Sequence, residues 1–189
     1  LGIHLIDLVR YLLDEVSCDH KQTPAYIGER PLSVESQTLE KVDVDDWALC
    51  TLGMENKAVG VIEVTRMSGG IPESTKLEIF GSQGTINIDF GNPMFVKYFD
   101  GKNKQWKIGD LGLSSPQDER PIEQLWPNSK MSLGTFVSAH IASIYDFLQC
   151  IYENKKSQVN FMTALADQEV LEAAYISASN KNTKIKIPL

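Results

Sequence analysis

The sequence lacks the glycine spacing of a nucleotide-binding loop. Of its 13 glycines, no two stand two positions apart, so the pattern Gly-x-Gly-x-x-Gly does not occur. That pattern lets a backbone loop approach a pyrophosphate and points the N-terminus of a helix at it. A Walker loop is missing as well. We therefore expect that this chain does not hold a dinucleotide by itself in the usual way.

Long apolar runs and a basic stripe are also missing. No apolar segment approaches the roughly 20 residues that a membrane-spanning helix needs, and the first residues do not read as a signal peptide. The formal net charge is −7, with 18 basic and 25 acidic residues. A protein that binds nucleic acid needs a basic footprint. We therefore predict that the protein binds neither nucleic acid nor a membrane.

Cysteine and histidine are scarce. The three cysteines are widely spaced and form no Cys-x-x-Cys pair, which is typical of a reducing compartment, so we expect free, mostly buried thiols in a cytoplasmic protein. The three histidines are far apart in the sequence, and no two share one face of a helix. Zinc sites need ligands at closer, regular spacing. We therefore predict no metal site.

What the sequence does contain is a clear succession of periodicities. Apolar residues first recur at helical spacing, then alternate with polar ones between short Gly, Asn and Asp turns, and finally return to helical spacing. The segment over 31–41 and the proline-containing segment over 109–131 are expected to be loops. The expected elements are a helix over 1–13, one strand within 16–30, strands over 46–54, 58–66, 76–80, 85–90, 94–99 and 105–108, helices over 134–153 and 162–179, and a strand over 183–187.

Strands and helices segregated in this way indicate an α+β fold. We expect a large, open, antiparallel-rich mixed sheet with helices packed on one face. Several strands place apolar residues on both faces, so the second face needs a cover of its own. A second copy of the chain is the natural candidate, which predicts a homo-oligomer through the open sheet face.

The beginning of the chain is informative. The sequence starts without Met, inside an amphipathic helix and without capping residues before it. A helix that lacks its first turn indicates a chain cut from a longer one. We interpret residues 1–189 as part of a longer protein.

His4 is the residue that the helix over 1–13 singles out. It lies in the first turns of an otherwise apolar helix, beside Gly2, which leaves open space on the surface. His4 is either a partly buried histidine that hydrogen-bonds nearby backbone or a functional residue, and the pattern alone favours the first. His140 is interpreted as structural. Asp7, one turn after His4, either orients the imidazole or pairs with Arg10, and the pattern favours the ion pair.

Several stretches together resemble one known family. Leu1-Gly2-Ile3-His4-Leu5-Ile6-Asp7-Leu8 resembles the stretch Asp-x-Gly-x-His-x-x-Asp of the glucose–fructose oxidoreductase, inositol dehydrogenase and rhizopine catabolism (Gfo/Idh/MocA) family. Each stretch alone is weak, but they follow the family's order over nearly the whole chain. The further stretches that are similar are 44–49, 54–60 and 62–65 in the central hairpin, 77–86 at a strand turn, and 173–179 in the last helix.

The resemblance implies a parent enzyme of two domains. An N-terminal Rossmann domain, absent from this chain, would bind NAD or NADP and supply a lysine. Residues 1–189 would form the substrate-binding and oligomerisation domain, with a fold like the C-terminal domain of dihydrodipicolinate reductase. The implied reaction is hydride transfer between the nicotinamide and a hydroxyl or carbonyl group of a sugar, inositol or related polyol. The fragment alone is expected to be inactive.

The resemblance also implies roles for particular residues. His4 falls on the family's histidine position, which makes it the catalytic candidate that hydrogen-bonds the reacting hydroxyl. The aspartate that accompanies it would directly precede Leu1. Arg66, at the end of the central hairpin, either meets substrate hydroxyls or a carboxylate, or lies at a surface or interface. Trp126, in the long loop, is expected to line or cover the substrate pocket.

Two other classes of function remain open at this point. Some proteins that resemble this family are sensors or repressors that keep the fold and lose the turnover, so the chain is alternatively a regulatory or oligomerisation domain. The lysine expected upstream of this chain would distinguish an enzyme from a sensor or repressor, because the enzyme needs it for catalysis. A stand-alone interaction domain unrelated to dehydrogenases is the third interpretation, and it predicts a start codon close to Leu1.

Overall fold

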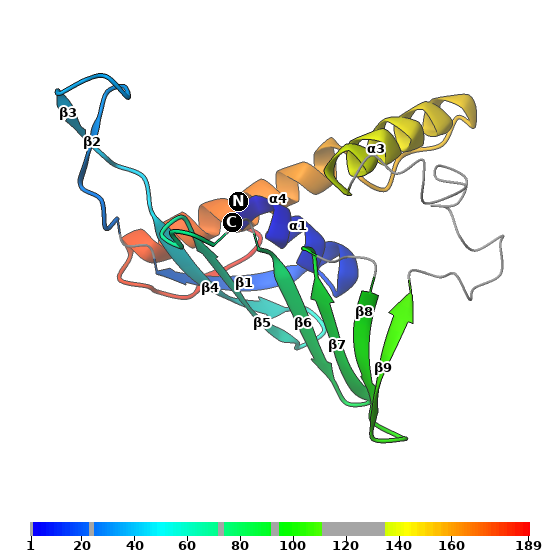
Figure 1. Cartoon of the computed structure of the whole chain (residues 1–189). Coiled ribbons are helices and arrows are strands. Elements are labelled where there is room, and N and C mark those ends of the chain that lie inside the picture. Colours follow the sequence, from blue (N-terminus) through cyan, green and yellow to red (C-terminus); the bar gives the residue numbers. More distant parts are fainter. Residues whose placement is uncertain (1, 23–24, 72–73, 92–94, 111–134) are drawn as a thin grey trace. The chain divides into compact units, whose positions relative to one another are not determined.

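A computed structural model describes residues 2–22, 25–71, 74–91, 95–110 and 135–189 (Figure 1). The chain divides into two compact units. The first combines residues 1–69 with 158–189, and the second consists of residues 70–157. Most of the irregular loop expected over 109–131 falls outside the described residues.

The first unit is a four-stranded sheet with helices, in which the two ends of the chain come together. Its strands run in the order β10-β1-β4-β5 and every pairing is antiparallel. A short hairpin, β2–β3, extends from it. The elements are α1 (Gly2–Leu12), β1 (Val16–Gln22), β2 (Glu29–Pro31), β3 (Leu39–Lys41), β4 (Trp47–Met54), β5 (Val59–Thr65), α4 (Phe161–Ser179) and β10 (Ile185–Lys186).

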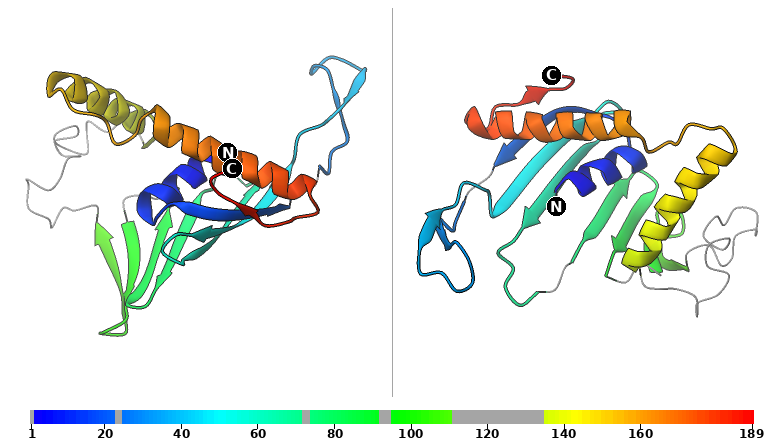
Figure 2. Two further views of the ribbon diagram at one scale, coloured as in Figure 1. Left: turned by 180° about the vertical axis from the view of Figure 1, so that it is seen from behind. Right: turned by 90° about the horizontal axis from the view of Figure 1, so that it is seen from above.

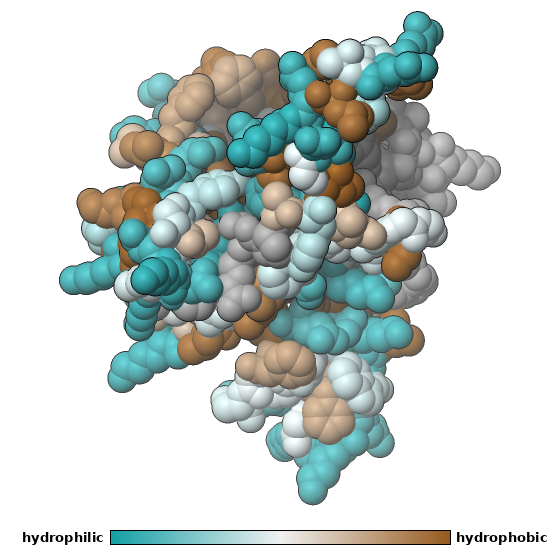
Figure 3. Space-filling model, turned by 90° about the vertical axis from the view of Figure 1, so that its left-hand side faces the viewer, coloured by the Kyte–Doolittle hydropathy of each residue, from teal (hydrophilic) through white to brown (hydrophobic). Residues whose placement is uncertain are grey.

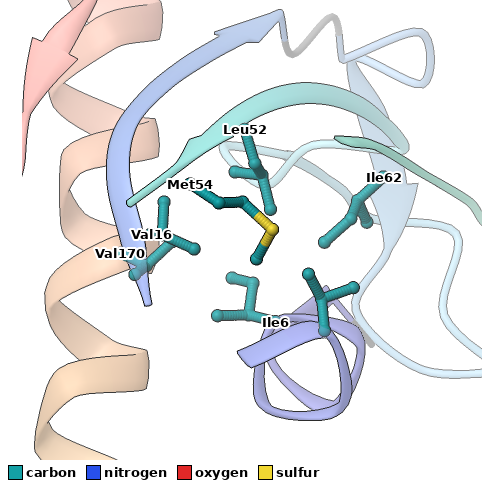
Figure 4. Close-up of a cluster of buried hydrophobic side chains, with 7 residues drawn as sticks. Ile6, Val16, Leu52, Met54, Ile62 and Val170 are labelled. Atoms are coloured by element: carbon teal, nitrogen blue, oxygen red, sulfur yellow. The ribbon is translucent and has the colours of Figure 1, made fainter. Parts of the chain in front are cut away.

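Helices α1 and α4 lie side by side on one face of this sheet (Figure 2). Alternation along β4 and β5 places Leu52, Met54 and Ile62 on that face, where they meet Ile6 of α1 and Val170 of α4 (Figure 4). Leu52 is fully buried. Burying one such side chain stabilises the fold by roughly 1.5–3 kcal/mol. The predicted α+β class, with helices on one face of an antiparallel sheet, is confirmed.

A capping box fixes the beginning of α4. The side-chain oxygen of Asn160 accepts hydrogen bonds from the backbone N–H groups of Met162 and Thr163, at 2.9 and 3.4 Å. In return, the hydroxyl of Thr163 accepts from the backbone N–H of Asn160 at 2.9 Å. These bonds satisfy N–H groups that a helix start otherwise leaves unpaired. The start of α4 is therefore set locally, one residue before the predicted range.

The hairpin β2–β3 corrects the loop that was expected over 31–41. Both of its strands are exposed along their whole length. Apolar alternation reports burial against a core, so a fully exposed hairpin gives no such signal. The hairpin is held at its base instead, by hydrogen bonds to the carboxylate of Asp46.

Hydrophilic and hydrophobic side chains are interspersed on the face of the molecule shown in Figure 3.

In the part of the second unit that the structure describes, the strands form an antiparallel meander in the order β6-β7-β8-β9, followed by helix α3. Asp100 closes the last turn, because its carboxylate accepts from the backbone N–H of Asn103 at 3.1 Å and from Nζ of Lys107 at 2.8 Å. These contacts hold the pKa of Asp100 well below its usual range, with the Lys107 bond as the largest cause. The elements are β6 (Lys76–Gly81), β7 (Gly84–Asp89), β8 (Phe95–Asp100), β9 (Gln105–Asp110) and α3 (Thr135–Tyr152).

Some expectations of burial were wrong. The helical spacing of apolar residues in the last helix predicts that Leu165 is buried, but its side chain is 60% exposed. The inward positions of α4 include Asp167 and Ser177 instead, because polar partners on α1 and β1 satisfy them. Cys50 and Cys150 were expected to be mostly buried, but they are half-buried. Within the described residues, no helix is both long and apolar enough to cross a membrane.

Candidate functional site

A cavity of about 320 Å³ lies within the first unit. Ligand sites are typically concave, mostly apolar and of this size or larger, with a few polar groups that fix orientation. Most of the lining is apolar, from both helices and from β4 and β5. The polar side chains that line it are Lys21, Asp45, Asp46, Thr65, Arg66 and Tyr175.

Lys21 is a cationic residue in a nearly inaccessible place. It is 2% exposed, although burial of an ammonium group is costly unless the charge is compensated. Its Nζ lies 3.6 Å from Oδ2 of Asp45 and 3.5 Å from the ring centre of Tyr175. A cation over an aromatic face gains roughly 0.5–2 kcal/mol. The carboxylate and the ring together stabilise the buried charge.

The backbone of Lys21 is held as well as its side chain. Its N–H donates to the hydroxyl of Ser177 at 3.1 Å. Ser177 is fully buried on α4, two residues after Tyr175. The same helix therefore fixes both ends of Lys21. This explains why a polar serine occupies an inward position of α4.

Asp45 connects Lys21 to Tyr175. Its Oδ1 accepts a hydrogen bond from the Tyr175 hydroxyl at 3.3 Å, while Oδ2 faces Lys21. Partial burial and the neighbouring Asp45 carboxylate raise the pKa of Tyr175 above its usual value. The phenol therefore keeps its proton and acts as a donor at neutral pH. Lys21, Asp45 and Tyr175 form one connected group of charges and hydrogen bonds at the cavity.

Asp46, the next residue, has a structural role. It is 2% exposed, and its carboxylate accepts from the backbone N–H groups of Tyr26 and Ile27 at 3.0 and 2.8 Å and from Arg30 at 2.8 Å. These bonds fix the base of the β2–β3 hairpin to the start of β4. They also lower the pKa of Asp46, with the Ile27 bond as the largest cause. The two adjacent aspartates therefore have different roles: Asp46 anchors backbone, whereas Asp45 contacts Lys21 and Tyr175 at the cavity.

The structure brings only part of the predicted site together. Arg66 is exposed and lines the cavity, and its backbone N–H donates to the carbonyl of Asp46 at 2.8 Å. His4 is exposed on α1, directly after Ile3, which lines the cavity. An added side chain at Gly2 would meet open space, as expected. Trp126 lies outside the described residues, and its role stays a prediction.

Asp7 is placed differently from the favoured interpretation. The ion pairs of Arg10 within the described residues are with Glu15 and Asp167. Asp7 lies near Asp167 instead, where its carboxyl group contributes to a raised pKa of Asp167; burial is the largest cause. The predicted pairing of Asp7 with Arg10 was wrong because Asp167, distant in sequence, occupies that position.

Sequence reasoning missed Lys21, Asp45 and Tyr175. Tyr175 lies inside a stretch that was recognised for its resemblance, but only its helical period was used. Strict alternation from the buried Val16 places Lys21 on the outward face of its strand. A β-bulge between Val16 and Cys18 shifts the register and turns Lys21 inward, and no sequence pattern indicated that bulge.

The chain is similar to known sugar dehydrogenases in sequence and in structure. Levoglucosan dehydrogenase of Pseudarthrobacter phenanthrenivorans is 26% identical over 189 residues, and the match covers 92% of this chain and 48% of that protein. A solved structure of levoglucosan dehydrogenase with NADH superposes with a TM-score of 0.86 at 26% identity, covering 100% of this chain and 49% of that one. The complex with NADH and levoglucosan gives a TM-score of 0.84 at 25% identity, with the same coverage.

These matches agree on the extent of the likeness. The chain spans about half the length of the relatives that it matches. A family model described as the C-terminal alpha/beta domain of an oxidoreductase family matches residues 1–187. The resemblance that the sequence motifs indicated is thereby confirmed, and the chain belongs to the C-terminal α/β domain family of the Gfo/Idh/MocA oxidoreductases.

Proposed function

We propose that this chain is the substrate-binding domain of a nicotinamide-dependent oxidoreductase that acts on a sugar, an inositol or a related polyol. The observation that carries the proposal is the mostly apolar cavity of the first unit with its few polar side chains, bordered by the helix that presents His4. Membership of a family of oxidoreductases, and similarity to a dehydrogenase solved with NADH and levoglucosan, support it.

The described residues do not fit a dinucleotide on their own. The cavity is mostly apolar, and two carboxylates, Asp45 and Asp46, are among its polar side chains. A pyrophosphate needs backbone N–H groups or cations rather than carboxylates. The proposed cofactor, NAD or NADP, would be held mainly by a separate Rossmann domain and would supply the hydride chemistry. The contribution of this chain is substrate orientation and proton handling.

His4 is the residue proposed for proton handling. Its exposed side chain on α1 is free to reach a group beyond the unit described here. A ring nitrogen of His4 would accept a hydrogen bond from the reacting hydroxyl and share its proton as the hydroxyl becomes a carbonyl. Arg66, at the cavity, would donate to other substrate hydroxyls. Neither role needs the chain to bind the cofactor itself.

The experiment uses the full-length protein with a panel of sugars and inositols, together with NAD and NADP. We expect reduction of the nicotinamide by at least one polyol. His4→Ala should then lower kcat by about 10²–10⁴-fold, the usual contribution of an acid–base group. His140→Ala, an exposed histidine on α3, is the control and should change kcat by no more than about twofold. Absence of turnover with every member of the panel would contradict the proposal and favour a sensor or regulatory domain.

We also propose that the protein is a homo-oligomer, assembled through the open face of the first unit's sheet. The two faces of β5 differ sharply. Ile62, on the helix side, is 7% exposed, whereas Val59 and Val61 on the other side are 75% and 65% exposed. Exposed β-branched residues on a sheet face indicate a surface that a partner covers. A second copy of the chain is the proposed occupant.

A further inference from the structure

The ammonium of Lys21 has more hydrogen-bonding capacity than the described residues use. It has three donors, and its neighbours are Asp45 at 3.6 Å and the Tyr175 ring at 3.5 Å. A separation of 3.6 Å is an ion pair but is longer than a hydrogen bond. Within the described residues, no oxygen accepts a hydrogen bond from Nζ. Lys21 is nonetheless 2% exposed and lines the cavity, so a ligand oxygen there would meet unused donors.

Asp45 offers the opposite capacity beside it. An ionised carboxylate has about four acceptor positions, and the hydrogen bond from Tyr175 at 3.3 Å occupies one on Oδ1. Its side chain is 24% exposed, so it stays accessible from the cavity. Unused donors and unused acceptors thus stand next to each other. A hydroxyl group satisfies both, because it accepts one hydrogen bond and donates another.

The charges at the cavity favour a neutral ligand. Lys21 and Asp45 compensate each other, and the charge of Asp46 is already compensated by Arg30 at 2.8 Å. A carboxylate or phosphate bound to Lys21 would also approach Asp45 and be repelled. The guanidinium of Arg66 is exposed, so water solvates its charge and an anionic ligand is not needed to compensate it. The apolar wall, which includes Ile3, Val64 and Leu171, suits the C–H face of a ring.

We propose that Lys21 and Asp45 form a specificity-determining subsite that binds two adjacent hydroxyl groups of a neutral polyol. Lys21 donates to the hydroxyl oxygens, Asp45 accepts from the hydroxyl hydrogens, and Tyr175 holds both side chains in place. The inference rests on the proposed function for the identity of the molecule, and it deepens that function by selecting neutral polyols over sugar acids. A site of this kind rejects analogues that lack a hydroxyl, because its buried polar groups would then be left unpaired.

The experiment compares wild-type full-length protein with Lys21→Met and Asp45→Asn. Two readouts are taken: kcat/KM, and the dissociation constant measured by calorimetry in the absence of turnover. The ligands are neutral hexoses and inositols, their single-deoxy analogues, and the corresponding uronic acids. For the best neutral ligand, we expect either substitution to weaken binding and lower kcat/KM by at least about 10-fold, the cost of an unpaired buried polar group. The preference for that ligand over one deoxy analogue should collapse in both variants.

Lys41→Met is the matched control, because Lys41 is exposed on the β2–β3 hairpin. It should change neither readout. If Lys21→Met does not fold, Asp45→Asn decides, since it preserves shape and the acceptor for Tyr175.

The two proposals fail in different ways. Polyol binding that both variants abolish, without turnover of any substrate, would support the subsite and contradict the enzymatic function. Turnover that the variants change by less than about threefold would leave the function standing and overturn the subsite. A preference of the wild type for uronic acids, or no binding of any neutral polyol, would overturn it as well.

Discussion

The guanidinium of Arg10 on α1 forms an ion pair with the carboxylate of Asp167 on α4, and each side chain is only 7% exposed. Arg10 also donates to both carboxylate oxygens of Glu15, at 2.8 and 2.9 Å, and to the backbone carbonyl of Thr163 at 3.0 Å. One buried cation therefore joins the first helix of the chain to the last. Because α1 also carries His4, this contact positions the proposed catalytic residue relative to the cavity.

Removing Arg10 should destabilise the fold strongly. Arg10→Met preserves much of the side-chain volume but leaves the carboxylate of Asp167 buried without its partner. Breaking a buried pair from one side typically costs about 3–5 kcal/mol. The free energy of unfolding, measured for this chain by urea denaturation, should fall by that amount.

Asp167→Asn is the contrasting variant. Burial raises the pKa of Asp167, so the charge itself is unfavourable there, and an amide oxygen still accepts from Arg10. We expect a change of less than about 1.5 kcal/mol in the free energy of unfolding. Equal losses in the two variants would show that the charge of Asp167 is required and that its burial is not the dominant cost.

Asp46 predicts a dependence of stability on pH. Because its pKa is lower in the folded protein, the folded state binds fewer protons than the unfolded state between the two pKa values. Its stabilising contribution is complete above the ordinary carboxyl pKa of about 3.9 and is lost as the pH falls through the folded value. Asp46→Asn should therefore be less stable than wild type at neutral pH, and the difference should shrink below about pH 4.

The measurement is urea denaturation of both proteins at a series of pH values. Glu40→Gln, on the exposed strand β3, controls for the loss of one negative charge and should follow the wild type throughout. A gap between wild type and Asp46→Asn that stays constant with pH would mean that the backbone N–H groups of Tyr26 and Ile27 do not need the ionised carboxylate.

Periodicity predicted most of the fold because it reports burial. The strand over Trp47–Met54 begins within one residue of its predicted start, because its buried residues Ala48, Leu52 and Met54 follow the two-residue period of a strand. The same reasoning fails where burial is absent, as in the hairpin over 29–41, or where polar partners distant in sequence replace apolar ones, as at Asp167. Alternation identifies strands but not their partners, and within the described residues the strands pair as two four-stranded sheets and a hairpin.

The candidate site was less accessible to sequence reasoning. His4 was proposed because it falls on the histidine position of a recognised family, and Arg66 because it ends the central hairpin; both roles stay predictions. Lys21, Asp45 and Tyr175 come from β1, the segment before β4 and α4, and are joined only by the tertiary fold. A buried lysine is visible in a sequence only when the register of its strand is known. Geometry supplied that register here.

Substitution of Gly84 should disrupt the sheet of the second unit locally. Its φ of +156° is rare for other residues, and a Cβ there would collide with the carbonyl oxygen of Phe99 on the neighbouring strand. Gly84→Ala should therefore disrupt the β7–β8 pairing and lower the free energy of unfolding by about 2 kcal/mol or more. At Gly81 an added Cβ would meet only an ordinary contact of 3.5 Å, so Gly81→Ala should cost less than about 1 kcal/mol. Hydrogen exchange of the β6–β9 amides distinguishes the two, and equal protection in both variants would contradict the assignment.

The open sheet face predicts the effect of a charge on assembly. Val61 is 65% exposed on β5, so Val61→Lys should leave the folded protomer intact while placing an ammonium in the proposed interface. Desolvating an unpaired charge at the centre of an interface costs several kcal/mol. The dissociation constant of the full-length oligomer, measured by sedimentation equilibrium, should therefore rise by at least about 10²-fold. Val34→Lys makes the same substitution at a fully exposed valine between β2 and β3, and it should assemble like the wild type. If Val61→Lys assembles normally while Val34→Lys does not, the hairpin rather than the sheet face holds the copies together.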